Sequence, residues 1–141
     1  MESELSGTLC ETEALLAAAR LAVRCELAEV VWPLHGGSAA DPDLVDVDLA
    51  AQTVSRCLLV ERLLIVEGAP APVVSAPFAD LCDRRLADLA IDMGLIPGDV
   101  WWSAGTSDAQ RVAAERWARA FEASGVPLRL ASAGRAGSGP G

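Results

Sequence analysis

The feature of this sequence that most constrains its fold is a short apolar run between two long helical patterns. Residues 28 to 32, Ala-Glu-Val-Val-Trp, are mostly β-branched or apolar and stop at Pro33, after which His35-Gly36-Gly37 predicts a loop. One helical pattern precedes this run and another follows the loop. That order is typical of a parallel α/β sheet, in which helices connect neighbouring strands.

Apolar residues recur at helical spacing in four segments. These segments are residues 11 to 26, 43 to 66, 82 to 93 and 108 to 124. The first opens on the capping-box pattern Thr8-x-x-Glu11 and the last on Ser107-x-x-Gln110. We expect the continuous apolar run from Leu63 to Val66 to be buried, and Trp117 to lie in the core.

Two further stretches favour strands. Val73-Val74-Ser75 predicts a second short strand, and residues 99 to 103 fit either a third strand or an extended loop, with one of Trp101 and Trp102 in the core. The sequence therefore predicts one α/β domain over residues 11–130, with a short parallel sheet flanked by about four helices. A flexible N-terminus (1–10) and a disordered tail (131–141) are expected to flank it.

Composition excludes several classes of function. The formal net charge is −9, whereas nucleic acids and anionic membrane surfaces require clustered cations, so neither is expected as a partner. All 11 cations are Arg, so the chain has no Lys to act as a phosphate-loop lysine, a Schiff base or a general base. Hydrophobic residues make up 52% of the chain, which is enough to build a core without a metal or a disulfide.

The sequence gives no sign of membrane insertion or metal binding. No window reaches the ~20 continuous apolar residues of a membrane helix, and the acidic start lacks the cationic region of a signal peptide, so we expect a cytoplasmic protein. The four cysteines form no Cys-x-x-Cys pair and are interpreted as small buried hydrophobic residues. They are Cys10, Cys25, Cys57 and Cys82.

The stretch from residue 73 to 125 carries several short motifs in a fixed order. The first is the predicted strand Val73-Val74-Ser75, and the loop Pro77-Phe78-x-Asp80-Leu81 follows it. After the loop come a helix with Leu89 that stops at Gly94, the pair Trp102-Ser103, and a closing helix with Arg116 or Arg119, Phe121 and Gly125. In this order the stretch resembles the C-terminal half of the 7-cyano-7-deazaguanine synthases, which act in queuosine biosynthesis. The likeness extends over about residues 12 to 126. It implies part of an adenine-nucleotide hydrolase-like (HUP) domain.

The resemblance also has three departures. Synthases of this family use ATP, magnesium and zinc to convert 7-carboxy-7-deazaguanine to its nitrile, yet their Ser-Gly-Gly-x-Asp-Ser nucleotide loop is missing from this sequence. The zinc cysteines are replaced as well, and a lysine of the family falls at Asp83. The positions of the zinc ligands fall at or near Ala104, Asp108, Arg111 and Ala114, which cannot form a thiolate site. No cofactor is therefore expected in this chain.

These departures leave two hypotheses for the function. One is a partial synthase-like protein of the 7-deazapurine pathway, not active alone, which is a truncated product, a subunit whose partner supplies the nucleotide loop, or a pseudoenzyme. The other is a non-catalytic interaction or oligomerisation module that kept the fold. Because a sheet of two or three short strands has open edges, we expect a homodimer or a partner chain.

Five residues are candidates for binding a small deazapurine ligand. They are His35, Asp41, Asp43, Trp102 and Ser103. His35 stands where a parallel strand ends, the two aspartates are able to hydrogen-bond a ring edge, and the tryptophan is able to stack on a ring. The alternatives are a solvated loop histidine, a loop turn with a helix N-cap at the aspartates, and a core tryptophan. No catalytic residue and no metal ligand is predicted.

Overall fold

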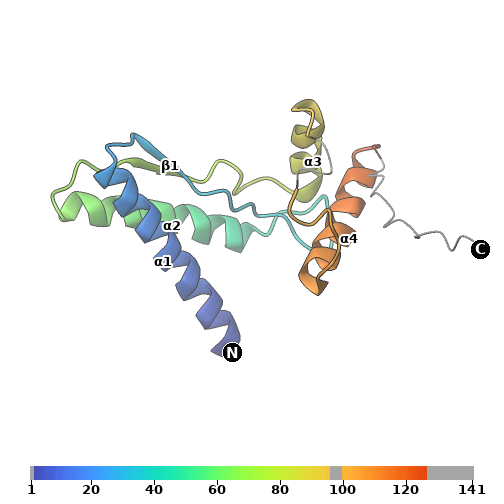
Figure 1. The fold of residues 1–141 in the computed structure, drawn as a ribbon, viewed down its shortest axis with the longest axis horizontal. Helices are drawn as coiled ribbons and strands as arrows, with labels where there is room; N and C mark the ends of the chain where they lie inside the picture. Colours follow the sequence, from blue (N-terminus) through green and yellow to red (C-terminus); the bar gives the residue numbers. More distant parts are fainter. Residues whose placement is uncertain (1, 96–99, 127–141) are drawn as a thin grey trace, which may run out of the picture. The chain divides into compact units, whose positions relative to one another are not determined.

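The computed structural model describes residues 2–95 and 100–126, with side chains from Cys10 onward. These residues form two compact units (Figure 1). Unit 1 consists of the described residues of Met1–Ser38 and Leu44–Cys82, and unit 2 of those of Ala39–Asp43 and Asp83–Gly141. The predicted tail at 131–141 lies outside the described residues.

Unit 1 contains two helices and a parallel two-stranded sheet. Its elements are α1 (Glu2–Arg24), β1 (Glu29–Val31), α2 (Val47–Val66) and β2 (Val73–Ser75). Within the ladder, Val30 is paired with Val74. In Figure 1, α1 crosses α2, and the packing contacts join α1 to β1 and α2 to β2. The order helix, strand, helix, strand is the predicted one, and each strand ends close to its predicted limit.

The core of unit 1 is a cluster of six buried side chains. They are Leu15, Ala19, Cys57, Val60, Leu64 and Val74. Val30 and Trp32 pack against this cluster, so the even-numbered face of the sheet is covered by α1 and α2. The opposite face is exposed, because Glu29, Val31 and Val73 carry the alternate positions of the two strands.

Both helices of unit 1 begin elsewhere than predicted. α1 starts at Glu2 and runs through the Thr8–Glu11 pattern, so the predicted start near residue 11 is wrong. α2 starts at Val47 instead of residue 43, because Asp46 is its N-cap and accepts a hydrogen bond from the Leu49 N–H at 3.0 Å. The preceding residues, Ala39–Asp43, belong to unit 2.

The predicted burial of the end of α2 is correct for one residue only. Leu64 is 1% exposed, whereas Leu63, Ile65 and Val66 are 41%, 53% and 82% exposed. The reason is that α1 and the sheet cover one side of α2, while a continuous apolar run places side chains on every side of a helix.

The described residues of unit 2 contain two helices, α3 (Asp83–Asp92) and α4 (Asp108–Ala123), which pack on each other. α4 begins with the predicted capping box: Ser107 accepts from the Gln110 N–H, and the Gln110 side chain accepts from the Ser107 N–H. Residues 100–104 form a bend followed by turns, so of the two alternatives predicted for residues 99–103 the third strand is not present at 100–103. Trp117 is half-buried.

The fold class is confirmed in its coarse form. The described residues form a mixed structure of four helices and a short parallel sheet of two strands. The expectation that all cysteines are buried is correct for two of the four. Cys57 and Cys82 are buried, whereas Cys10 and Cys25 are exposed, because one lies on an uncovered side of α1 and the other follows that helix.

Candidate functional site

Within unit 2, the two candidate aspartates are occupied by contacts inside the protein. The Asp43 carboxylate lies 3.0 Å from Nε of Arg84, and Oδ1 of Asp41 accepts a hydrogen bond from the Asp43 N–H at 2.9 Å. The Arg84 N–H donates to the Pro42 carbonyl, and Arg119 donates to the Ala39 carbonyl. The loop is therefore attached to both α3 and α4, and its acidic groups take part in that attachment.

Trp102 and Ser103 also lie in unit 2. Trp102 is 6% exposed and Trp101 is 65% exposed, which confirms that one tryptophan of the pair is in the core. The Ser103 N–H donates to the Val100 carbonyl in the turn that carries both residues. The buried indole of Trp102 has no open ring face on which a flat ligand stacks; the exposed ring is that of Trp101.

His35 lies in unit 1, between β1 and the start of α2, and is half-buried. The neighbouring Gly36 is buried, and a Cβ atom built on it falls 2.2 Å from the backbone oxygen of Ala79. The backbones of the segments that follow β1 and β2 are therefore in direct contact, and only glycine fits at position 36.

The four positions at which the resemblance implies zinc ligands do not fit a metal. Asp108 and Arg111 form an ion pair one turn apart on α4, and Ala104 and Ala114 carry no ligand atom. Elsewhere in the described part of the chain, no three His, Cys, Asp or Glu side chains come together as metal ligands. Asp83, at the position where the resemblance implies a lysine, is 1% exposed and accepts two hydrogen bonds from Arg116, at 2.6 and 2.7 Å.

Two ionisable groups have pKa values shifted by their surroundings. Hydrogen bonding to Asp83 raises the pKa of the Arg116 guanidinium, so this side chain stays charged under all ordinary conditions. Burial raises the pKa of the Cys57 thiol, which lowers its thiolate fraction and its nucleophilicity. Neither pKa shift makes its group more reactive, so both side chains are interpreted as structural.

A hollow of about 660 Å³ lies beside the carboxyl end of β2. Its lining is mainly apolar, from the first half of α2 and the segment after β2, and its polar side chains are Ser55 and Asp80. The carboxyl ends of parallel strands are where open α/β sheets bind ligands. The segment Pro77–Leu81, whose sequence resembles the loop motif of the synthases, contributes Pro77, Ala79 and Asp80 to this hollow.

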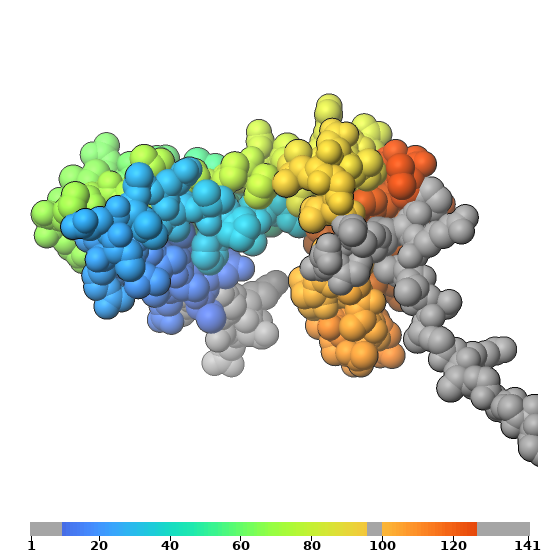
Figure 2. Space-filling model, turned by 45° about the horizontal axis from the view of Figure 1, so that its top comes forward, coloured from blue at the N-terminus to red at the C-terminus, as the bar shows by residue number. Residues whose placement is uncertain are grey.

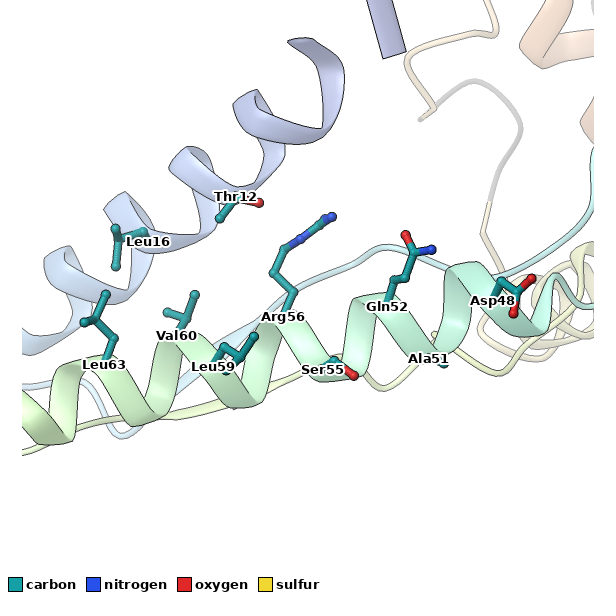
Figure 3. A pocket seen from close by; sticks show the side chains of 10 residues that line it. All are labelled: Thr12, Leu16, Asp48, Ala51, Gln52, Ser55, Arg56, Leu59, Val60 and Leu63. Atoms are coloured by element: carbon teal, nitrogen blue, oxygen red, sulfur yellow. The ribbon is translucent and has the colours of Figure 1, made fainter. Parts of the chain in front are cut away.

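A second hollow of about 600 Å³ separates α1 from α2 (Figure 3). Figure 3 shows Leu16 facing Val60 and Leu63 at its narrow end, and Arg56 extending into the space between the helices. Nη1 of Arg56 lies 2.9 Å from Oε2 of Glu11 on α1. This groove therefore has an apolar end and a polar end, and an ion pair bridges its two walls.

The sheet of unit 1 is uncovered on one face and along one edge. Val31 and Val73 are 50% and 57% exposed on that face, where the Ser75 hydroxyl also donates to Glu29 at 2.9 Å. Figure 2 shows β1 and the segment after it, in light blue, at the visible surface of unit 1. None of the five predicted site residues belongs to either strand of this incomplete sheet. The short strand patterns in the sequence are the signal that indicates an incomplete sheet.

Comparisons with protein-family models, with curated proteins and with solved structures found no match to this chain. In the described residues, no helix combines the length and the apolar character that crossing a membrane requires. The class of protein defined by the structure is thus a small mixed domain with a partly covered parallel sheet.

Proposed function

We propose that this chain is a non-catalytic assembly module, which associates with a second copy of itself through the incomplete sheet of unit 1. The observation that carries the proposal is the exposure of Val31 and Val73 on a parallel sheet that helices cover on one face only. Parallel sheets are normally buried on both faces, and open strand edges are normally paired or covered. Association with a second copy would pair an open edge of this sheet.

The chemistry of the candidate residues supports assembly over catalysis. Asp43 and Asp83 are engaged with arginines, Asp41 accepts from a backbone amide, and Trp102 is buried. Each of these four side chains is engaged in contacts within unit 2. By contrast, apolar side chains are exposed in unit 1 on both the sheet and α2, and their burial is favourable by roughly 25 cal/mol per Å².

Sedimentation equilibrium of the full chain, from about 10 µM to about 1 mM, tests self-association. We expect the mass average to rise from monomer towards dimer across that range. Val31→Glu, which places a charge on the uncovered sheet, should keep the chain monomeric. The matched control is Val112→Glu on α4, where the valine is 67% exposed, and it should associate as the wild type does. A wild-type chain that stays monomeric throughout would overturn the proposal.

A second candidate is a partial synthase-like protein whose partner supplies the nucleotide loop. The hollow at the carboxyl end of β2 favours it, because the family's loop motif lines that hollow and contributes Asp80. This candidate carries with it the expectation that unit 1 is part of an adenine-nucleotide hydrolase-like domain. Its ligand would be a small deazapurine, and its cofactors would bind mainly to the partner.

Titration calorimetry with 7-carboxy-7-deazaguanine and with ATP tests this second candidate. It predicts heat with the deazapurine that disappears in Asp80→Ala, while Asp88→Ala on α3 keeps it. No heat with either compound at about 100 µM protein excludes the candidate. Metal analysis adds a separate check, since zinc in a stoichiometric amount would contradict the assignment of Ala104, Asp108, Arg111 and Ala114 as unable to bind it.

A further inference from the structure

The two edges of the sheet in unit 1 differ in how their backbone groups are satisfied. The ladder uses the Ala28 carbonyl, which accepts from the Val73 N–H, and the Trp32 N–H, which donates to the Ser75 carbonyl. Because peptide groups alternate sides along a strand, the N–H and C=O groups of Glu29 and Val31 point away from β2. Those groups form the outer edge of β1.

The outer edge of β2 is closed by a side chain of its own unit. The Val74 N–H points away from β1 and donates to Oε2 of Glu61 on α2 at 3.2 Å. A charged side chain placed on an edge is a common protection against pairing with another chain. The outer edge of β1 has no such cover from a strand, because the sheet in the described residues has two strands only. Pairing is therefore favoured at β1 and opposed at β2.

We propose that the outer edge of β1 pairs with β1 of a second copy, antiparallel and about a two-fold axis. This inference rests on the proposed function and deepens it by naming the interface. The resulting sheet has four strands in the order β2, β1, β1 of the second copy and β2 of the second copy. A two-fold axis uses the same edge twice, so the interface closes and no fibre grows from it.

Charge and hydrogen bonding select one register for this pairing. With Val30 opposite Val30 of the second copy, each Glu29 lies opposite Val31 of the other chain, and these residues exchange hydrogen bonds in both pairs. A shift towards the N-terminus places the two Glu29 carboxylates directly opposite each other, which is repulsive. A shift towards the C-terminus places Glu29 opposite Pro33, which has no N–H to donate.

The interface is small, and its size sets the expected affinity. A three-residue edge buries much less than the ~1,200–2,000 Å² of a stable protein–protein interface. We therefore expect a dissociation constant of roughly 100 µM, so that the dimer forms at the upper end of the concentration range. An association that is complete at low micromolar concentration would point to a larger surface, such as the groove between α1 and α2.

Disulfide trapping of Val30→Cys tests the register. Its background is Cys10→Ser with Cys25→Ser, which removes the two exposed thiols. Opposed residues of a non-hydrogen-bonded antiparallel pair have Cα atoms about 4.5 Å apart, within the range of a disulfide. We expect Val30→Cys to give a covalent dimer on mild oxidation, and Val31→Cys or Val73→Cys to stay monomeric on a non-reducing gel.

Val31→Pro tests the edge separately. The Val31 N–H points away from β2, so proline removes an outward donor and leaves the β1–β2 ladder in place. We expect the sedimentation mass of Val31→Pro to remain that of a monomer at about 1 mM, while Val73→Thr on the neighbouring strand dimerises normally. Circular dichroism establishes that both variants are folded, and the cysteine experiment remains decisive if Val31→Pro is not.

The outcomes separate this inference from the proposed function. A wild-type dimer in which Val30→Cys does not cross-link would overturn the β1 interface and leave self-assembly standing. Preferential trapping of Val31→Cys would overturn the register. A chain that is monomeric at every concentration would overturn both proposals at once.

Discussion

Unit 1 and unit 2 are stabilised by different kinds of interaction. Unit 1 is built on six buried side chains, all apolar, contributed by α1, α2 and β2. Unit 2 is built around the carboxylate of Asp83, which is 1% exposed and bound by Arg116. Among its described residues, the other buried side chains are three alanines and Trp102. A mainly apolar core tolerates exchange of one hydrophobic side chain for another of similar volume, whereas a buried charge fixes its partner in one geometry.

The surfaces of the two units differ in another way. In unit 1, α2 alone exposes Val54, Leu58 and Leu59 at 45%, 57% and 69%, and the sheet exposes two more valines. In unit 2, the loop Ala39–Asp43 is joined to the helices by polar contacts. Unit 2 also exposes apolar side chains, among them Trp101 and Val112, but in the described residues only unit 1 combines them with an open strand edge, which is why we place assembly there.

The largest effect is expected for a volume change in the core of unit 1. Leu64→Ala should lower the free energy of unfolding of unit 1 by about 4 kcal/mol, because Leu64 is 1% exposed and the cavity cannot collapse easily. Urea unfolding gives the energy, and hydrogen exchange by mass spectrometry assigns it to peptides of unit 1. Leu59→Ala, at a leucine that is 69% exposed, should cost no more than about 0.5 kcal/mol.

The next largest effect is expected for a charge change in unit 2. Asp83→Asn leaves Arg116 without its carboxylate, and we expect the free energy of unfolding to fall by about 3 kcal/mol. This value is at the low end for a buried pair, because the Arg116 side chain is 27% exposed. The same exchange experiment should show the loss in α3 and α4. Asp108→Asn removes an exposed pair and should cost about 0.5 kcal/mol or less. Equal effects of the two variants would contradict the contrast between the units.

A third effect tests the backbone contact in unit 1. Gly36→Ala forces a Cβ against the backbone oxygen of Ala79 and should cost about 2 kcal/mol, measured by urea unfolding. The second variant, Gly36→Ala with Ala79→Gly, should recover none of this loss, because the opposing atom belongs to the backbone. Recovery in the double variant would mean that side-chain packing limits this position.

The strands were predictable from the sequence because their signals are local. Val73-Val74-Ser75 follows Gly68–Pro72, and the run at 28 to 32 stops at a proline, so the breakers mark both positions. The starts of α1 and α2 were not predictable from caps alone. The Thr8–Glu11 pattern lies inside α1, and of the nearby aspartates only Asp46 has a helical N–H within reach of its side chain.

The candidate site was less predictable, because its contacts are not local. The pairing of Asp43 with Arg84 joins the loop after Ser38 to a helix that comes after β2, and no spacing rule indicates it. The exposure of one face of the sheet likewise depends on which other elements pack against the strands, and the strand sequences alone do not indicate this. An apolar run such as Leu63 to Val66 indicates burial only if enough chain is present to cover every side of the helix.

The smallest expected effect tests a local interaction in unit 2. Ser107→Ala removes the side chain that accepts from the Gln110 N–H at 3.2 Å, and it should cost about 1 kcal/mol of stability in α4. Ser107→Asp keeps an acceptor at the N-cap and should restore most of that energy, as urea unfolding of both variants would show. Gln110 also donates to the Trp101 carbonyl at 2.7 Å, so hydrogen exchange should increase in the turn before α4 as well as in its first turn. An effect confined to the first turn of α4 would mean that the turn is held independently, by Trp102 in the core.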